Sequence, residues 1–270
     1  MRSRRWRYLR KLPYYGHALV ALAKVATWGS IVRCVARPTA PVRLRDGSTL
    51  HIGSRLDLLV LAECWADDVY GLRSARASPG DIVVDVGAGI GDFAIAAATR
   101  LEGVTVRSFE PNPISFALAE RNLRALSGTV SVEAVAIGTA SRYRLGDVRR
   151  GPLSTAARTV SGADVAVVEA RRLDDAVPAG HVALLKIDCE GLELDVLESG
   201  GDLLQRVERV VVEYHRHLAA DSDRRVAAVL EGHGFETQIR PDPYDPAIGY
   251  VDARRVSRST PARDPGTGLT

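Results

Sequence analysis

Residues 83–92 read Val83-Val84-Asp85-Val86-Gly87-Ala88-Gly89-Ile90-Gly91-Asp92. An apolar run ends here in a glycine-rich turn, and the residues that follow, 93–100, have a helical pattern. This order predicts a strand, a tight loop and the N-terminus of a helix, an arrangement that binds nucleotide-like ligands. Glu110 ends the next predicted strand, nineteen residues after Gly91. A carboxylate at that position can accept hydrogen bonds from two ribose hydroxyls, so the stretch predicts a nucleoside-bearing cofactor.

Strands and helices alternate around this stretch in two halves. The first half has predicted strands over 82–86, 104–109 and 130–134 and predicted helices over 92–100 and 113–126. The second half has predicted strands over 182–188 and 207–213, predicted helices over 192–198 and 221–232, and a terminal hairpin made of 235–239 and 249–253. This alternation predicts an α/β fold with a mostly parallel, doubly wound sheet that ends in an antiparallel hairpin.

Composition and pattern divide the 270 residues into four parts. A main domain over 81–255 is long enough to bury one core, and it carries a β-rich insertion over 141–172. A lead-in segment over 42–80 is predicted to form a hairpin and a helix. Residues 1–41 form a basic arm that is predicted to be helical. The tail over 256–270 is rich in Pro, Gly, Ser and Thr and is predicted to be disordered.

Cysteine usage indicates the compartment. Cys34, Cys64 and Cys189 are odd in number and do not have the spacing of metal ligands. This pattern argues against both a disulfide framework and a zinc site. We therefore expect a reducing compartment, the cytoplasm.

Positive charge is concentrated at the N-terminus. Residues 1–45 contain eleven Arg or Lys and no acid, whereas the remaining residues contain 25 basic and 33 acidic side chains. One interpretation is peripheral contact with an anionic membrane surface, or capture of an anionic substrate. The alternative is a helix packed on the domain with a frayed basic end. The apolar stretch from His17 to Val32 is interrupted by Lys24 and is shorter than the ~20 residues of a spanning helix.

Two details of the glycine loop distinguish between cofactors. The spacing is G-x-G-x-G rather than the G-x-G-x-x-G of dinucleotide-binding loops, and Asp85 stands two residues before the first glycine. A loop that binds pyrophosphate gains nothing from a nearby carboxylate. A cofactor that carries a cationic amine and a sulfonium does gain from one. The loop therefore favours S-adenosyl-L-methionine over NAD.

Acidic side chains and a histidine follow two strands of the second half. Asp188 and Glu190 come after one predicted strand, and Glu213 and His215 lie at the end of the next. Residues two apart project to the same side of an extended chain, so Glu213 and His215 can point together into a cleft. If the two strands are neighbours, the four groups form one polar cluster. Lys186 is either a partner of a cleft acid or a charge that reaches out of a buried strand.

The cluster allows two chemistries for methylation of a hydroxyl. The oxygen must lose its proton as it attacks, which requires a positioned base. His215, with an ordinary pKa of about 6.5, suits this task at neutral pH, and Asp188 is the alternative base. A divalent cation held by Asp188, Glu190 and Glu213 could instead acidify the hydroxyl. The base without a metal is the interpretation we favour.

Five stretches resemble the successive blocks of FkbM-type methyltransferases, and the resemblance runs from about Asp57 to Gly232. They are Val84 to Gly91, Phe109 to Pro113, Arg172 to Asp175, Leu185 to Glu193, and Val212 to His215. The resemblance implies a class I methyltransferase Rossmann-like fold, with S-adenosylmethionine as the donor. It also implies that Asp188 and Glu190 line the methyl-transfer end. The candidate cofactor contacts are Asp85, Gly87, Ala88, Gly89, Gly91, Glu110, Pro111 and Asn112.

These observations lead to one functional hypothesis. The chain is expected to be an S-adenosylmethionine-dependent O-methyltransferase that acts on a hydroxyl of a sugar, a glycoside or another natural-product small molecule. The alternatives are an NAD(P)-dependent oxidoreductase and a non-catalytic scaffold that binds the cofactor. Nucleic acid is not expected as the acceptor, because the Asn-Pro-Pro-Tyr and Pro-Cys blocks typical of base methyltransferases do not occur in the sequence.

Overall fold

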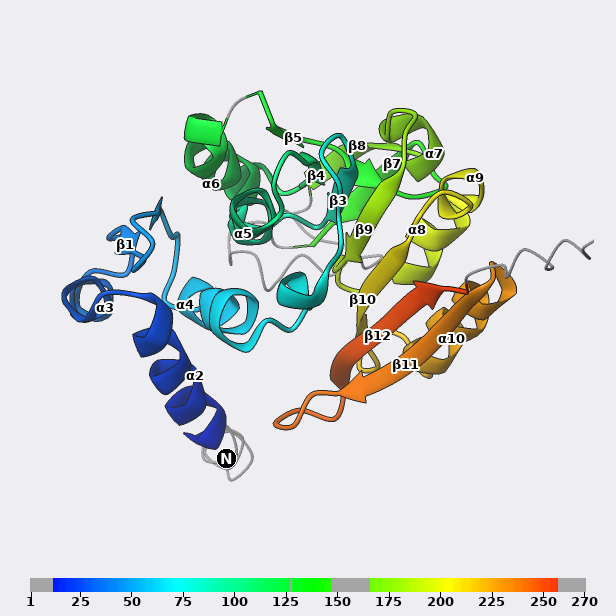
Figure 1. The fold of residues 1–270 in the computed structure, drawn as a ribbon. Helices are drawn as coiled ribbons and strands as arrows, with labels where there is room; N and C mark the ends of the chain where they lie inside the picture. The colour runs from blue at the N-terminus through cyan, green and yellow to red at the C-terminus, as the bar shows by residue number, and fades with distance from the viewer. Residues whose placement is uncertain (1–11, 127, 147–165, 257–270) are drawn as a thin grey trace, which may run out of the picture.

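The computed structural model describes residues 12–126, 128–146 and 166–256, and its centre is a seven-stranded sheet (Figure 1). The strand order is β11-β12-β10-β9-β3-β4-β5. The bounds are β3 (Ile82–Val86), β4 (Thr105–Phe109), β5 (Val130–Glu133), β9 (Val182–Ile187), β10 (Arg209–His215), β11 (Phe235–Pro241) and β12 (Ile248–Arg255). The pairs from β10 to β5 are parallel, whereas β12 is antiparallel to both its neighbours. The predicted mostly parallel sheet with a terminal hairpin is confirmed.

Helices cover both faces of this sheet (Figure 1), and the central strands β3 and β9 are buried along their whole length. Such strands have near-continuous apolar sequences because both faces are covered. Val83 and Leu184 pack with α5 (Asp92–Arg100) and α6 (Pro113–Leu123) on one face. Their neighbours Val84 and Leu185 point the other way, toward the helices of the second half. These are α7 (Leu173–Ala176), α8 (Glu193–Glu198), α9 (Gly201–Leu204) and α10 (Ser222–Gly232).

The order of the sheet reverses between β3 and β9, and this switch point positions the site. Ligands of open α/β sheets bind beyond the carboxyl ends of the strands at such a point. The loops that follow β3 and β9 meet there, since the backbone N–H of Asp188 donates a hydrogen bond to the carbonyl of Val86 at 3.0 Å. The glycine loop and the first acids of the predicted cluster are therefore neighbours.

The N-terminal region packs on the main domain. Its described elements are α2 (Leu12–Val25), α3 (Trp28–Ala36), β1 (Val42–Arg43), β2 (Thr49–Leu50), α4 (Asp57–Leu61), a π-helix (Ala62–Asp67) and a 3-10 turn (Leu72–Ser74). Ala21 and Leu22 of α2 share one core cluster with Leu61 of α4. The described part of the arm is helical and packs on the domain. Among the described residues, no helix is long and apolar enough to cross a membrane.

The remaining elements lie beside the main sheet. They are a 3-10 turn (Arg124–Leu126), β6 (Ala136–Ile137), β7 (Arg142–Leu145) and β8 (Ala166–Arg171), and the three strands form a second small sheet in the order β6-β8-β7. The described part of the segment over 141–172 contains β7 and β8. Residues 147–165 of the insertion and 257–270 of the predicted tail lie outside the described residues.

Candidate active site

Two cavities meet at the carboxyl ends of the central strands. The first, of about 110 Å³, is lined by the loop after β3, and we call it the glycine-loop cavity. The second, of about 300 Å³, is lined by Tyr14, Tyr15, Tyr70, Tyr244 and Tyr250, and we call it the tyrosine cavity. Four residues line both cavities and form a shared wall: Val60, Tyr70, Asp188 and Glu190. The arrangement can hold two ligands that touch at this wall.

Five of the eight candidate cofactor contacts line the glycine-loop cavity. They are Gly87, Ala88, Gly89, Glu110 and Pro111. Asp85, Gly91 and Asn112 do not line the cavity and instead support the residues that do. Gly91 precedes α5, where a side chain would press on Leu123 of α6. The side chain of Asn112 caps α6 by accepting a hydrogen bond from the backbone N–H of Ile114 at 2.9 Å.

Two glycines of the loop have different reasons to be glycine. Both have a positive φ, +79° at Gly87 and +55° at Gly89, which side chains rarely adopt. A Cβ on Gly87 would also lie 1.7 Å from the carbonyl oxygen of Asp188. A Cβ on Gly89 would meet no atom within 4 Å. Glycine is therefore required at position 87 so that the loop after β3 can pass close to the backbone after β9, whereas glycine at position 89 leaves space in the cavity.

Glu110 is fixed at the end of β4 by two backbone groups. Its Oε2 accepts a hydrogen bond from the N–H of Gly89 at 2.7 Å, and its Oε1 accepts one from the N–H of Asn112 at 2.8 Å. Burial raises the pKa of Glu110 to about 7, although both hydrogen bonds oppose this shift. The carboxylate keeps lone pairs that face the cavity and can accept hydrogen bonds from a ligand.

Asp85 lies beneath the cavity and forms an ion pair with Lys186. The two residues are partners in the register of β3 and β9, and Lys186 Nζ lies 3.0 Å from Asp85 Oδ1. Burial by itself lowers the pKa of Lys186, but attraction to Asp85 and Asp188 outweighs it and raises the pKa above its ordinary value. Asp85 is fully buried, so the expected direct contact with a cofactor is corrected to a supporting role. Lys186 proves to be a partner of buried acids.

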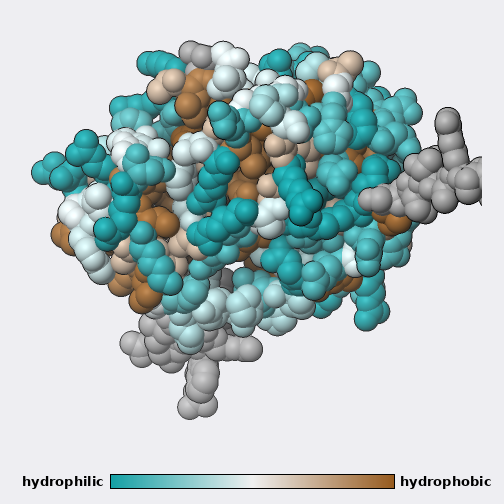
Figure 2. All heavy atoms as spheres, in the orientation of Figure 1, coloured by the Kyte–Doolittle hydropathy of each residue, from teal (hydrophilic) through white to brown (hydrophobic). Residues whose placement is uncertain are grey.

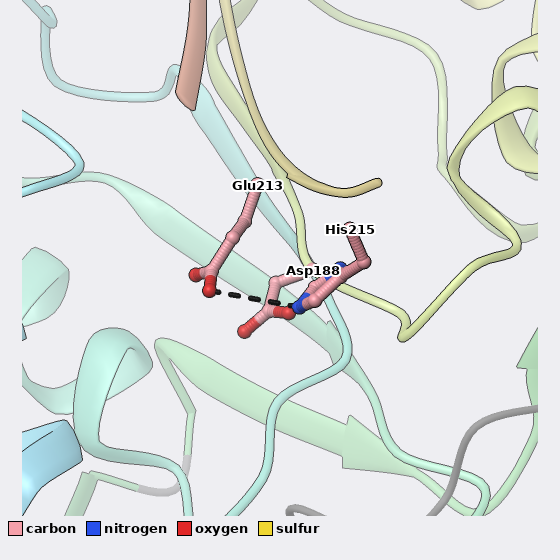
Figure 3. Close-up of side chains that lie close together, drawn as sticks. All are labelled: Asp188, Glu213 and His215. Carbon is pink, nitrogen blue, oxygen red and sulfur yellow. Dashed lines mark ion pairs between the residues drawn. The ribbon is translucent and has the colours of Figure 1, made fainter. Parts of the chain in front are cut away.

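The four groups expected to cluster do lie together at the wall of the tyrosine cavity. Asp188, Glu190, Glu213 and His215 all line it, and Figure 3 shows three of them pointing toward one another. The hydroxyl of Tyr70 donates to Glu213 Oε2 at 3.0 Å and lies 3.3 Å from Asp188 Oδ2. Glu190 has a φ of +52°, in the left-handed region that non-glycine residues rarely occupy. Strained backbone of this kind is concentrated at functional sites.

The charge of His215 differs from the expectation. Its Nδ1 lies 2.9 Å from Glu193 Oε1, and its Nε2 lies 3.8 Å from Glu190 and 3.7 Å from Glu213. Burial lowers the pKa of His215, but the hydrogen bond with Glu193 and the nearby carboxylates outweigh burial and raise the pKa to about 10. The imidazole of this arrangement is protonated at neutral pH. The choice of His215 as the base relied on an unperturbed pKa and is corrected.

The carboxylates beside His215 hold protons more tightly than usual. Burial raises the pKa of Glu190 to about 7; the charge of Asp188 adds to this rise and the charge of His215 opposes it. Burial, followed by the charge of Asp188, raises the pKa of Glu213 well above its ordinary value. At neutral pH both side chains therefore carry a proton for a larger fraction of the time than an exposed carboxylate does.

Sequence reasoning assigned no role in the site to three of its residues. Glu193 is buried and accepts a hydrogen bond from the backbone N–H of Gly191 at 2.8 Å; its signals are its place in the family block and in the first turn of a predicted helix. Tyr14 and Glu63 line the tyrosine cavity, and the Tyr14 hydroxyl donates to Glu63 Oε1 at 2.7 Å. Nothing in the sequence near Tyr14 indicates this contact, which depends on the packing of α2.

Comparison with known proteins gives consistent matches. A family model described as the methyltransferase FkbM domain matches residues 85–237. The 31-O-demethyl-FK506 methyltransferase FkbM of Streptomyces tacrolimicus is 31% identical over 80% of this chain and 97% of its own length. The hexuronic acid methyltransferase AglP of Haloferax volcanii is 32% identical over 78% of this chain and 92% of its own. The structure of a methyltransferase FkbM from Methylobacillus flagellatus KT aligns over 73% of this chain and 53% of its own, with 16% identity and a TM-score of 0.49.

Proposed function

Since this chain belongs to the FkbM family of S-adenosylmethionine-dependent methyltransferases, we propose that it methylates a hydroxyl group of a sugar or of a glycosylated natural product. Because the family consists of methyltransferases, the alternative of an NAD(P)-dependent oxidoreductase is excluded. Two relatives support the acceptor class by their names, one for a natural product and one for a hexuronic acid. The fold is that of class I methyltransferases.

The residues of the glycine-loop cavity fit the cofactor. Glu110 presents a carboxylate that would accept hydrogen bonds from ribose hydroxyls, and Gly89 leaves room for the ligand to approach the backbone. The loop after β3 lies at the switch point where such ligands bind. S-adenosylmethionine supplies an electrophilic methyl group on a sulfonium and is left as S-adenosylhomocysteine.

The observation that carries the proposal is the wall shared by the two cavities. Tyr70, Asp188 and Glu190 line both, so an acceptor in the tyrosine cavity would meet the methyl donor at these side chains. Alignment of two reactants in this way supplies much of the rate of a group transfer. The tyrosine rings give flat apolar faces with polar edges, which suits a small molecule that carries hydroxyls.

Glu190 is the group that we assign to proton removal. It lines both cavities, and its carboxylate lies beyond hydrogen-bonding distance of His215 Nε2, at 3.8 Å. Asp188 and Glu213, by contrast, both lie within hydrogen-bonding distance of the single hydroxyl of Tyr70, at 3.3 Å and 3.0 Å. As the acceptor oxygen bonds to the methyl carbon, its proton passes to the Glu190 carboxylate. A base whose pKa lies near the working pH suits this transfer.

A transfer assay tests the function directly. Purified protein is incubated with methyl-labelled S-adenosylmethionine and a panel of sugars and glycosides, and labelled products are located by mass spectrometry and NMR. We expect an O-methylated product, and Glu190→Gln should lose turnover by roughly a hundredfold or more while it keeps its affinity for S-adenosylhomocysteine. Methylation at nitrogen or carbon, or full turnover by Glu190→Gln, would contradict the proposal.

A further inference from the structure

Asp188, Glu213 and His215 have the spacing of a metal-binding set. Each offers one ligand atom to the tyrosine cavity, and these atoms all lie within 4.8 Å of one another. Ligand atoms held by one ion at about 2.1–2.4 Å lie up to about 4.2–4.8 Å apart. The three side chains come from the ends of the neighbouring strands β9 and β10 and point toward one another (Figure 3). Small side-chain adjustments would bring all three onto one ion.

A buried carboxylate orients the imidazole of this set. Glu193, which is 1% exposed, lies 2.9 Å from Nδ1 of His215. This contact leaves Nε2, on a ring that is 3% exposed, directed at Glu190 and Glu213 at distances longer than a hydrogen bond. Histidines that ligate metals almost always donate their other N–H to a carboxylate or a carbonyl. Glu193 therefore holds the His215 ring as a metal-binding imidazole is held, and a cation that binds Nε2 would displace the proton which that nitrogen carries at neutral pH.

The two carboxylates are oriented as well. The hydroxyl of Tyr70 bridges Asp188 Oδ2 and Glu213 Oε2, which leaves a second oxygen on each carboxylate for another partner. Such outer hydrogen bonds also orient ligating carboxylates at metal sites. Lys186 Nζ lies 3.9 Å from the Asp188 oxygen that faces Tyr70, so the second oxygen of each carboxylate is the one left for a cation.

We propose that Asp188, Glu213 and His215 bind a divalent cation, and Mn²⁺, which suits the two carboxylates of the set, is the probe for it. The cation would coordinate the acceptor hydroxyl and favour its ionised form beside Glu190. That role in catalysis rests on the proposed function, whereas binding of the cation does not. Metal titration without acceptor or cofactor therefore tests the site by itself.

The experiment titrates Mn²⁺ into the full-length protein and follows free Mn²⁺ by electron paramagnetic resonance. We expect one site per chain, with affinity at least roughly tenfold weaker in Glu213→Gln and in Asp188→Asn. Asp242→Asn is the matched control, since Asp242 lines the same cavity outside the cluster. Its Oδ1 accepts from the N–H of Tyr244 at 2.8 Å, a bond that asparagine keeps. The control should bind Mn²⁺ as the wild type does.

A second measurement needs no variant. The ring of His217 lies 5.8 Å from that of His215 between centroids, whereas His51 and His181 do not line the tyrosine cavity. In the NMR spectrum of the wild-type protein, Mn²⁺ should therefore broaden the imidazole signals of His215 and His217 before those of His51 and His181. Binding of S-adenosylhomocysteine, measured in parallel, reports separately on the proposed function and on the folding of the variants. The absence of Mn²⁺ and Mg²⁺ binding at millimolar concentration, or equal losses in Glu213→Gln and Asp242→Asn, would overturn the proposal.

Discussion

Glu110 shows how one buried carboxylate can couple cofactor binding to pH. Its pKa of about 7 means that a large fraction is protonated below neutrality, whereas a ribose hydroxyl donates best to the ionised form. We expect the affinity for S-adenosylhomocysteine to fall about tenfold as the pH is lowered from about 8 to about 6. Calorimetric titration across this range measures the effect.

Glu110→Gln is the control for this pH dependence. Glutamine keeps an acceptor for backbone N–H groups but cannot ionise, so binding should be weaker and independent of pH over the same range. If the affinity of Glu110→Gln still changed with pH, the titration would belong to another group.

For the stability of the unliganded protein, the raised pKa of Glu110 acts in the opposite direction, favouring low pH. The contribution of Glu110 to stability is full below about pH 4.5 and is lost as the pH rises through about 7.

At the scale of elements, the site depends on how the loop after β3 passes the end of β9. The loop begins at Gly87, which lies against the backbone of Asp188. The backbone carbonyl of Gly87 accepts a hydrogen bond from Lys186 Nζ at 2.5 Å. Beneath the loop, an ion pair between Asp85 and Lys186 links the neighbouring strands β3 and β9. A buried pair of this kind is costly to break, because one charge is then left without its partner.

Two alanine substitutions separate the structural role of this loop from its binding role. Gly87→Ala should lower the free energy of unfolding by about 3 kcal/mol or more, since the Cβ would collide with the Asp188 carbonyl and φ is positive. Gly89→Ala should cost only about 1–2 kcal/mol, for its positive φ. Its Cβ would enter the cavity and weaken binding of S-adenosylhomocysteine. Urea unfolding and calorimetry measure the two effects, and equal destabilisation by both would contradict this division.

At the scale of the whole molecule, the N-terminal helices have two faces, one packed on the domain and one exposed. The inner face of α2 packs on the domain and brings Tyr14 to the tyrosine cavity. The outer faces of α2 and α3 expose apolar side chains, and Figure 2 shows such residues among hydrophilic ones on this side of the molecule. The exposed apolar residues are Leu19, Val20, Trp28, Val32 and Val35. Exposed basic residues of the same region are Lys24, Arg33 and Arg37.

An apolar face with basic neighbours is typical of peripheral binding to anionic membranes. We expect the protein to sediment with vesicles that contain phosphatidylserine, and the double variant Trp28→Ser with Val32→Ser to reduce this binding roughly tenfold. Val167→Ser is the matched control, because Val167 is 61% exposed on β8, outside these helices. Equal binding to uncharged vesicles, or an equal loss in Val167→Ser, would contradict the prediction.

The sequence by itself determined the order of strands and helices, the glycine loop and the position of Glu110. These features are local, because the apolar periods, the glycines and the acids at strand ends lie within a few residues of one another. Burial of both faces of β3 and β9 was also readable, since each is apolar apart from one charged residue, Asp85 or Lys186. The family blocks lie in the same segments.

Only the tertiary structure decided the charge of His215, the burial of Asp85 and the contribution of Tyr14. Each depends on a residue from another element: Glu193 beside His215, Lys186 beside Asp85, and Glu63 beside Tyr14. A pKa and a cavity wall are set by the distances between groups that folding brings together. Those distances are absent from any local pattern in the chain.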